Sequence, residues 1–329
     1  MRIVVTGATG FIGSNLAQML TSQGHEVIAT GKATIAVESA RLKRLEQAGV
    51  HVVTGSLLDP GLTASIVMGC DTVIHLAAAQ HEGNVPDSYF YDINVIGTRR
   101  LIDAAANAGA RRFVYGSTIG VYGDAVSGEL DEDSPPHPEN AYARTKLQAE
   151  RVVAEFAPRI ETCIARISET YGPDDFRLLK LFRGIDRGRF FILGSGLNVR
   201  QVIYVDDLSR ALLLAAQHHA AVGQTIVLCG STVMTTNEMV GTIAGALGRR
   251  RAIRKLPVWP FRAAAAVLEA TLRPLGIQPP LTQRRLDFFT KSFQFSTARS
   301  RNLLGFEPKV SFEAGAAKTA KWYRQAGYL

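Results

Sequence analysis

The sequence has few cysteines, no long hydrophobic run and no dominant charge of one sign. Its 329 residues include three cysteines, Cys70, Cys163 and Cys229, which lie far apart and at no spacing typical of metal ligands. A disulfide scaffold and a metal site are therefore not expected, and the thiols indicate a reducing, cytoplasmic compartment. No stretch reaches the ~18–20 apolar residues of a membrane span. A strand-like run begins directly after Met1, so we expect no secretory leader.

The charge balance is mildly basic, with 37 Lys and Arg residues against 29 Asp and Glu residues and a net charge of +8. An excess of this size is compatible with nucleic acid, an anionic membrane surface or a phosphorylated substrate. The densest basic run, Arg249 to Lys255, lacks the interleaved aromatic side chains on which bases stack. We therefore expect no nucleic-acid partner. The run is interpreted as a solvated face, with a partner-binding patch as the alternative.

Short apolar runs alternate with helical stretches through the first half of the chain. The expected strands are residues 2–6, 26–30, 50–54, 72–76, 112–115 and 162–167, and the expected helices are 12–22, 39–48, 62–68, 87–107 and 141–156. Strands that are apolar almost throughout are typical of a sheet buried on both faces. Alternation with helices favours right-handed crossovers, which predicts an α/β fold with a doubly wound parallel sheet.

The first expected strand runs directly into a glycine-rich turn, Thr6-Gly7-Ala8-Thr9-Gly10-Phe11-Ile12-Gly13, and then into a helix. Such a unit presents free backbone N–H groups and the positive end of a helix dipole to a phosphate. Gly7 suits the sharp turn, Gly10 the approach of a pyrophosphate, and Gly13 the packing of helix on strand. We predict a Rossmann-type dinucleotide site that includes Gly7, Gly10, Phe11, Ile12 and Gly13.

The regular alternation stops after about residue 172. Residues 176–187 are expected to form a helix, 188–200 a hairpin or loop, and 201–205 and 225–229 two further strands with a helix at 207–217 between them. The remainder, 234–329, is mostly helical with proline breaks. We predict a dinucleotide-binding domain of residues 1–175, to which 201–232 return. Residues 176–200 and 233–329 are predicted to form a smaller, mostly helical lobe that binds substrate.

The nucleotide preference depends on the end of the second strand, where an acidic residue would bind the adenosine ribose. That position reads Thr30-Gly31-Lys32. No carboxylate there repels a 2′-phosphate, and Lys32 is able to neutralise one. The pattern favours NADP over NAD, with Lys32 as a plain solvated lysine as the alternative.

A tyrosine and a lysine stand four residues apart in the expected helix 141–156, so Tyr142 and Lys146 share one face. A phenol has a pKa near 10, too high for a base at neutral pH. A neighbouring ammonium group favours the phenolate and lowers that pKa. Upstream, Ser117 and Thr118 place hydroxyl groups after the fifth strand, at the sheet edge where such folds bind ligands.

In combination these features resemble the extended short-chain dehydrogenase/reductases, the NAD(P)-dependent epimerase/dehydratase family. The resemblance covers essentially the whole chain. Besides the glycine turn it includes His75-Leu76-Ala77-Ala78, Asn94-Val95-Ile96-Gly97-Thr98, Ser117-Thr118, the Tyr142/Lys146 pair, Arg166 to Pro173, Val205-Asp206-Asp207 and Leu304-Gly305-Phe306-Glu307-Pro308.

The resemblance implies a role for each matching position. Tyr142 matches the general acid/base, Lys146 the residue that binds the nicotinamide ribose and tunes the tyrosine, and Thr118 the hydroxyl that bonds the reacting substrate oxygen. The implied cofactor-binding residues also include Gly31, Lys32, Ser56, Leu57, Leu76, Ala77, Ala78, Asn94 and Ser117. A homodimer through helices 87–107 and 141–156 is implied as well.

Four departures from the family pattern bear on cofactor and substrate. Family members that dehydrate sugars carry Asp-Glu where this chain has Ile119 and Gly120, so we predict that it is not a 4,6-dehydratase. Ser56 replaces an aspartate near the adenine. Glu169 replaces an asparagine facing the substrate, which disfavours a bound diphosphate. Arg200 stands where nucleotide-sugar enzymes bind the diphosphate, and a guanidinium suits that task.

The sequence leaves three functions to be weighed. The leading one is an NAD(P)-dependent oxidoreductase or epimerase acting on a secondary alcohol or ketone of a nucleotide-linked sugar, with Thr118, Glu169 and Arg200 facing the substrate. The alternative is a hydroxysteroid- or dihydroflavonol-type dehydrogenase, because the C-terminal lobe is apolar and Glu169 is easier to accept there. A catalytically silent cofactor-binding regulator is disfavoured by the intact Thr118, Tyr142 and Lys146.

Overall fold

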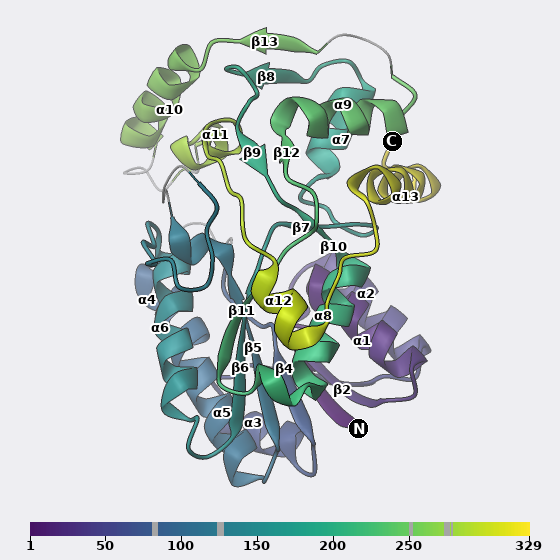
Figure 1. Cartoon of the computed structure of the whole chain (residues 1–329), viewed down its shortest axis with the longest axis vertical. Helices are drawn as coiled ribbons and strands as arrows, with labels where there is room; N and C mark the ends of the chain where they lie inside the picture. The colour runs from purple at the N-terminus through teal and green to yellow at the C-terminus, as the bar shows by residue number, and fades with distance from the viewer. Residues whose placement is uncertain (81–84, 124–127, 250–252, 273–276, 278) are drawn as a thin grey trace.

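A seven-stranded parallel sheet forms the centre of the protein, with the strand order β11-β6-β5-β4-β1-β2-β3 (Figure 1). The computed structural model describes residues 1–80, 85–123, 128–249, 253–272, 277 and 279–329. The sheet strands are β1 (Arg2–Thr6), β2 (Glu26–Gly31), β3 (His51–Thr54), β4 (Thr72–His75), β5 (Arg112–Thr118), β6 (Glu161–Ile167) and β11 (Gln224–Leu228). The strand order reverses between β1 and β4, so the predicted doubly wound Rossmann fold is confirmed.

Helices cover both faces of this sheet. One layer consists of α1 (Phe11–Ser22), α2 (Ala36–Gln47) and α8 (Val205–Gln217), and the other of α3 (Pro60–Val67), α5 (Gly97–Asn107) and α6 (Ala141–Glu155). Successive strand residues point to opposite faces. Accordingly, Val73 of β4 packs in the core beneath α3, α5 and α6, whereas its neighbour Ile74 packs in the core beneath α1 and α8. Both side chains are fully buried.

Two expected elements differ from the observed ones. The single helix expected at 87–107 is divided into α4 (Asp87–Tyr91), a π-helical turn (Asp92–Ile96) and α5, because the turn is widened around the buried Asn94. The hairpin allowed for 188–200 is wrong. Its strands β8 (Phe191–Leu193) and β9 (Val199–Arg200) pair with later strands, β13 (Arg254–Leu256) and β12 (Met234–Thr235), and not with each other.

A second group of elements packs beyond the carboxyl ends of the sheet strands (Figure 1). Its helices are α7 (Leu179–Asp186), α9 (Thr236–Ala246), α10 (Trp259–Leu272), α11 (Gln283–Thr290) and α13 (Phe312–Gln325), with the short strands β7 (Thr170–Tyr171), β8, β9, β10 (Ile203–Tyr204), β12 and β13. Phe182, Met239 and Tyr323 bring α7, α9 and α13 into one core. Within the described residues no helix is both long and apolar enough to cross a bilayer.

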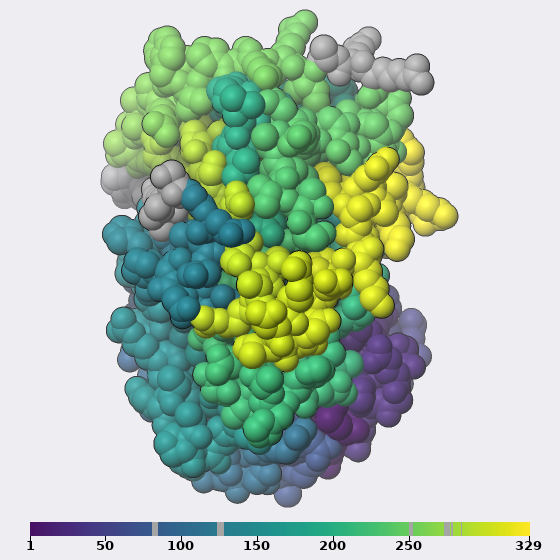
Figure 2. Space-filling model, viewed as in Figure 1, coloured from purple at the N-terminus to yellow at the C-terminus, as the bar shows by residue number. Residues whose placement is uncertain are grey.

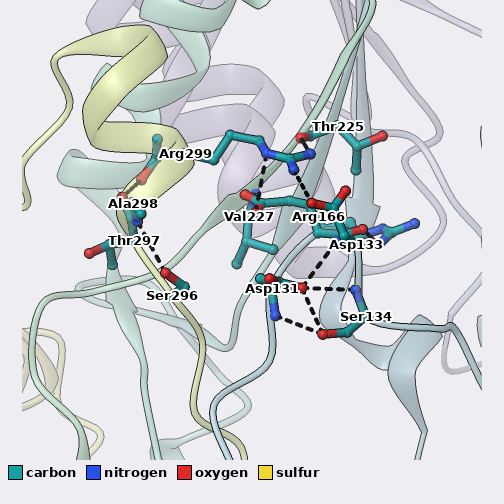
Figure 3. Close-up of polar contacts among 12 residues, drawn as sticks. Asp131, Asp133, Ser134, Arg166, Thr225, Val227, Ser296, Thr297, Ala298 and Arg299 are labelled. Carbon is teal, nitrogen blue, oxygen red and sulfur yellow. Dashed lines mark hydrogen bonds and ion pairs between the residues drawn. The ribbon is translucent and has the colours of Figure 1, made fainter.

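The outer edge of the sheet, at β11, is closed by side chains. Glu132 is buried, and its Oε1 accepts a hydrogen bond from the backbone N–H of Val227 at 2.7 Å. Arg299 of α12 (Ala298–Leu304) binds Asp133 at 2.6 Å and lies 3.6 Å from the Glu132 carboxylate. Figure 3 shows the Arg299 side chain extending toward Asp133. The Glu132 side chain therefore occupies a backbone N–H that the edge strand would otherwise offer to another strand.

Phe182 tests the core that joins α7 to α9 and α13. Its side chain is fully buried, so Phe182→Ala leaves a cavity and is expected to lower the free energy of unfolding by about 3–5 kcal/mol. Phe191→Ala, at a position that is 36% exposed, serves as the matched control and is expected to cost much less. Urea denaturation measures both; equal losses would contradict this description of the core.

Candidate functional site

The glycine turn after β1 forms a tight backbone cradle at the carboxyl edge of the sheet. Gly7 has a positive φ of 71°, and a Cβ atom there would lie 2.7 Å from the backbone nitrogen of Ala77, which follows β4. A Cβ atom at Gly13 would overlap the Gly7 carbonyl group. Gly10 is the N-cap of α1, whose first turn carries no acidic residue. The turn thus exposes backbone N–H groups to an anion and leaves no room for larger residues.

A hydrogen-bonded chain fixes the segment after β4, where Leu76, Ala77 and Ala78 are half-buried. Thr98 Oγ1 donates to the Asn94 carbonyl oxygen, so His75 Nε2 donates to Thr98 Oγ1 at 2.9 Å. His75 Nδ1 then accepts from Thr6 Oγ1 at 2.6 Å. Burial, reinforced by the Lys146 charge, lowers the pKa of His75 to about 3. His75 is therefore a neutral structural histidine.

Asn94 connects this segment to α6. Its Oδ1 accepts from the backbone N–H of Ala79 at 2.8 Å, and its Nδ2 donates to the Ala79 carbonyl and to Thr145 Oγ1. The π-helical turn widens the helix at this position, a distortion that often marks functional sites. Asn94 is 1% exposed and all its polar atoms are engaged. It holds the surrounding backbone in place.

The positions predicted to surround the adenosine lie at the ends of β2 and β3. Gly31 ends β2, and a Cβ atom there would lie 2.7 Å from Thr9 Oγ1, so a larger residue would displace the Thr9 side chain of the glycine turn. The next residue, Lys32, is exposed. Ser56 Oγ accepts a hydrogen bond from the Leu58 backbone N–H at 3.3 Å, so Ser56 stabilises the turn after β3.

Tyr142 and Lys146 both lie in the first half of α6, as the sequence predicted. The helix begins after Asn140, whose side chain accepts from the Ala143 N–H at 2.9 Å. Tyr142 is half-buried, whereas Lys146 is 1% exposed with its Nζ 4.1 Å from the ring centroid of Tyr115. Burial lowers the pKa of Lys146 to about 7, against the opposing effect of Glu150.

Tyr115 on β5 is a neighbour that the sequence reasoning did not identify. It is fully buried, and burial together with Glu150 and Tyr142 raises the pKa of its phenol well above 10. Tyr115 therefore stays protonated, and its ring face lies next to the Lys146 ammonium group. An aromatic ring face attracts a cation. Its place two residues before Ser117, on the same face of β5, was the available signal.

Glu150 was also missed, and Arg166 was noted only as the first residue of a family motif. Arg166 on β6 donates to both carboxylate oxygens of Glu150, at 3.1 Å and 2.8 Å, and both side chains are buried. Glu150 also accepts from Ser117 Oγ. Spacing offered a signal, because Glu150 follows Lys146 by four residues and Tyr142 by eight on one helix face. Next to Ser117, Thr118 Oγ1 accepts from the Gly120 N–H at 3.0 Å, which leaves its hydroxyl hydrogen able to donate.

The two charged residues predicted to face the substrate bind each other. Arg200 Nη1 lies 2.6 Å from both carboxylate oxygens of Glu169, and its Nη2 donates to the Phe288 carbonyl oxygen at 2.6 Å. Arg200 is 3% exposed, and its guanidinium lies 4.2 Å from the Phe288 ring centroid. The structure brings these residues to α11, where Lys291 binds Glu139 near the start of α6. Arg200 therefore does not present a free guanidinium.

Comparison with known proteins identifies relatives that match almost end to end. A 2-alkyl-3-oxoalkanoate reductase from Stenotrophomonas maltophilia is 31% identical over 96% of this chain and 97% of its own length. A dTDP-glucose 4,6-dehydratase from Streptomyces niveus is 28% identical over 98% and 93%. The crystal structure of DesIV, a dTDP-glucose 4,6-dehydratase from Streptomyces venezuelae with NAD bound, superposes with a TM-score of 0.79 at 28% identity, over 99% of this chain and 97% of that one.

These relatives overturn one prediction. The exclusion of 4,6-dehydratases is wrong, because dTDP-glucose 4,6-dehydratases are among the full-length relatives. At the two positions after Thr118 on which that exclusion rested, Ile119 is buried and Gly120 has no side chain. A ligand site in this fold collects residues from several loops at the carboxyl edge of the sheet. Two positions without an acid therefore do not exclude an acid and a base at the site.

The family model extends from β1 to the residues after β11. The model of the NAD dependent epimerase/dehydratase family matches residues 3–230, which contain the glycine cradle, the β4 segment, Asn94 and the Tyr142/Lys146 pair. The resemblance noted from the motifs is confirmed, and the chain belongs to the NAD dependent epimerase/dehydratase family.

Proposed function

We propose that the protein is an NAD(P)-dependent oxidoreductase or epimerase that acts on a secondary alcohol or ketone of a nucleotide-linked sugar. The observation that carries this proposal is the buried Lys146, one helical turn after Tyr142 and beside the buried Tyr115. A lysine is buried at a cost that structure alone rarely justifies, and such groups cluster at functional sites. The DesIV dehydratase with bound NAD supports the sugar-nucleotide class.

The cofactor fits the residues present. A Cβ atom at Gly7 or Gly13 would collide with backbone atoms, and one at Gly10 would lie 3.0 Å from the Gly7 carbonyl oxygen, so the cradle keeps the compact glycine turn that precedes a phosphate-binding helix. Phe11 and Ile12 begin the helix that faces the phosphates, and the remaining proposed contacts are Gly31, Lys32, Ser56, Leu57, Leu76, Ala77, Ala78, Asn94 and Ser117. When bound, NAD(P) accepts or supplies the hydride. The exposed Lys32, with no carboxylate in 30–32, supports a preference for NADP.

Three side chains would handle the proton of the reacting hydroxyl. Tyr142 takes the proton when the alcohol is oxidised and returns it when the ketone is reduced. Lys146, when protonated, favours the phenolate form of Tyr142. Thr118 donates its hydroxyl hydrogen to the same substrate oxygen. Because Ser117 is held by Glu150, the β5 end that carries Thr118 is fixed in position.

A second candidate is a reductase or dehydrogenase for an apolar alcohol or ketone. The Glu169–Arg200 pair favours it, because a guanidinium already bound to a carboxylate is a poor diphosphate ligand. The relative named 2-alkyl-3-oxoalkanoate reductase supports this class. In both candidates residues 176–200 and 233–329 form the substrate lobe, and 1–175 with 201–232 hold the dinucleotide.

Two further predictions complete the proposal. A homodimer would form through the outer faces of α4, α5 and α6, where Tyr91 is a large side chain that is 44% exposed. Sedimentation velocity would detect it. A cytoplasmic location is supported by three free, buried cysteines.

Tyr142→Phe tests the proposed chemistry. The variant lacks the proton-carrying hydroxyl, so kcat is expected to fall by about 10²–10⁴ while NADH and NADPH still bind. Hydride transfer followed by absorbance and cofactor titration measure the two effects. Tyr328→Phe, which removes a phenol of the C-terminal lobe and keeps the ring that packs on Trp322, is the control. Full activity of the Tyr142→Phe protein would remove the proposed mechanism.

Lys146 predicts a pH-dependent stability. The unfolded chain keeps this proton up to a pKa of 10.5, whereas the folded protein releases it at about 7. Between these values the unfolded chain binds more protons, so the Lys146 contribution to the free energy of unfolding rises with pH and is lost as pH falls through 7. Urea denaturation from pH 7 to 10 should show wild type gaining stability relative to Lys146→Met. The exposed Lys180→Met is the control, and a difference independent of pH would refute the assignment.

Glu169→Gln separates the two substrate classes. Removing the carboxylate frees Arg200, and UDP or dTDP should then bind at least about tenfold more tightly, since the like-charge repulsion is gone. Calorimetric titration of both proteins measures this. Tight binding of UDP or dTDP to wild type supports the sugar-nucleotide class. Binding only to the variant supports the apolar class, and no binding to either protein refutes a diphosphate role for Arg200.

A further inference from the structure

Helix α10 has an unusual surface for a helix of a folded protein. In this 14-residue helix only Ala265 is buried, while Trp259 is 73% exposed and Val267 is 61% exposed. The other exposed apolar residues of the helix are Ala263, Ala264, Ala266 and Ala270. A surface helix normally carries polar residues on its outer face. Here the outer face is apolar, with Arg262 as its exposed cation.

The surroundings of α10 are basic. Arg254 and Lys255 on β13 are exposed directly before the helix, and Arg187 and Arg189 are exposed before β8, with which β13 pairs. No Asp or Glu occurs in residues 187–200 or 253–268, and the one acidic residue of α10, Glu269, is half-buried and accepts a hydrogen bond from the Gln283 backbone N–H at 3.5 Å. Arg254 and Lys255, the last residues of the basic run Arg249–Lys255, therefore belong to this surface. Arg249 binds Asp186 at 3.2 Å instead, and residues 250–252 lie outside the described residues.

The apolar helix and the cations occupy one end of the molecule, remote from the sheet. Figure 2 shows this segment at the upper end of the visible face, and Figure 1 places α10 next to β13 and β8. Beneath it, Ala265 packs with Leu193 of β8 and Leu286 of α11, so the helix is attached to the lobe. The surface is thus held on a packed base.

We propose that this surface, formed by α10 with the adjoining β8–β13 edge, binds an anionic lipid bilayer. An apolar helix flanked by Lys and Arg, with a tryptophan at its end, is the pattern that partitions into the membrane interface. At 1.5 Å per residue the 14 residues extend about 21 Å, too short to cross the hydrocarbon core, so α10 lies in the plane of the interface.

A second copy of the chain is a poorer occupant of this surface. Two-fold symmetry would place the same patch on both sides of the contact. Arg254, Lys255 and Arg262 would then meet a patch of the same net positive charge, whose one acidic residue, Glu269, is half-buried and bound to the Gln283 backbone N–H. An anionic bilayer supplies negative headgroups for the Lys and Arg side chains and an apolar phase for the exposed face of α10.

Flotation with lipid vesicles tests the proposal on the full chain. Wild type should float with phosphatidylcholine vesicles that contain phosphatidylglycerol, and not with pure phosphatidylcholine. Salt should weaken the association, because the attraction is screened. Failure to float with the anionic vesicles, or equal association with both types, would overturn the proposal.

Variants locate the contact. Trp259→Glu combined with Val267→Glu should abolish flotation, and Arg254→Gln or Lys255→Gln should each weaken it about fivefold. Met68→Glu is the matched control, since Met68 is 66% exposed on the sheet domain. Loss of flotation with Met68→Glu, or its retention in the double variant, would contradict the assignment of the surface to α10.

Fluorescence provides a readout that is independent of folding defects. The chain has two tryptophans, and Trp322 packs on Tyr328 with ring centroids 5.7 Å apart. Anionic vesicles should therefore shift the emission of Trp259 to shorter wavelength, and Trp259→Phe should remove the shift while flotation persists. Sedimentation velocity without lipid tests whether a second copy of the chain binds this surface instead. A dimer that Trp259→Glu dissociates would assign the surface to a second copy and overturn the proposal.

Discussion

The ion pair between Glu150 and Arg166 is the interaction on which the centre of this protein depends. It joins α6 to β6 inside the fold, and Ser117 attaches β5 to the same carboxylate. Breaking a buried pair by removing one partner is far more costly than any surface pair, because an uncompensated charge is left. The Glu150 carboxylate also provides the counter-charge near Lys146. One acidic side chain thus positions the β5 hydroxyls and makes a buried ammonium group tolerable.

The fold was predictable because its signals are local. Apolar strands, the glycine turn at Gly7 and the Tyr142/Lys146 spacing each lie within a few residues, and the structure places them as expected. The partners of these residues were not predictable in the same way. Arg166 of β6 meets Glu150 of α6, and Arg200 of β9 meets Glu169 after β6, so each contact joins elements that are distant in the sequence. Periodicity gives the face that a residue occupies, but not the side chain that it contacts across two elements.

Substrate class is where sequence reasoning was weakest, for a related reason. Dehydratases were excluded because Ile119 and Gly120 carry no acid. The family to which the chain belongs, and its near full-length relatives, nevertheless include dehydratases. The Arg200 position illustrates the opposite case, in which a suitable residue type is present but engaged. Its guanidinium is bound by Glu169 and by the Phe288 carbonyl group. Residue type therefore indicates a capacity, and the neighbouring side chains decide whether it is available.

The π-helical turn at Asp92–Ile96 limits how this segment is able to change length. A regular α-helix advances 100° per residue, so loss of one residue from the widened turn would rotate everything before it by about that angle relative to α5. Tyr91 and the rest of α4 would then leave their present side of the molecule, and Asn94 would no longer reach Ala79 and Thr145 together. Insertions and deletions are therefore expected in the loops that flank α4 and α5, and the turn itself is a fixed-length joint.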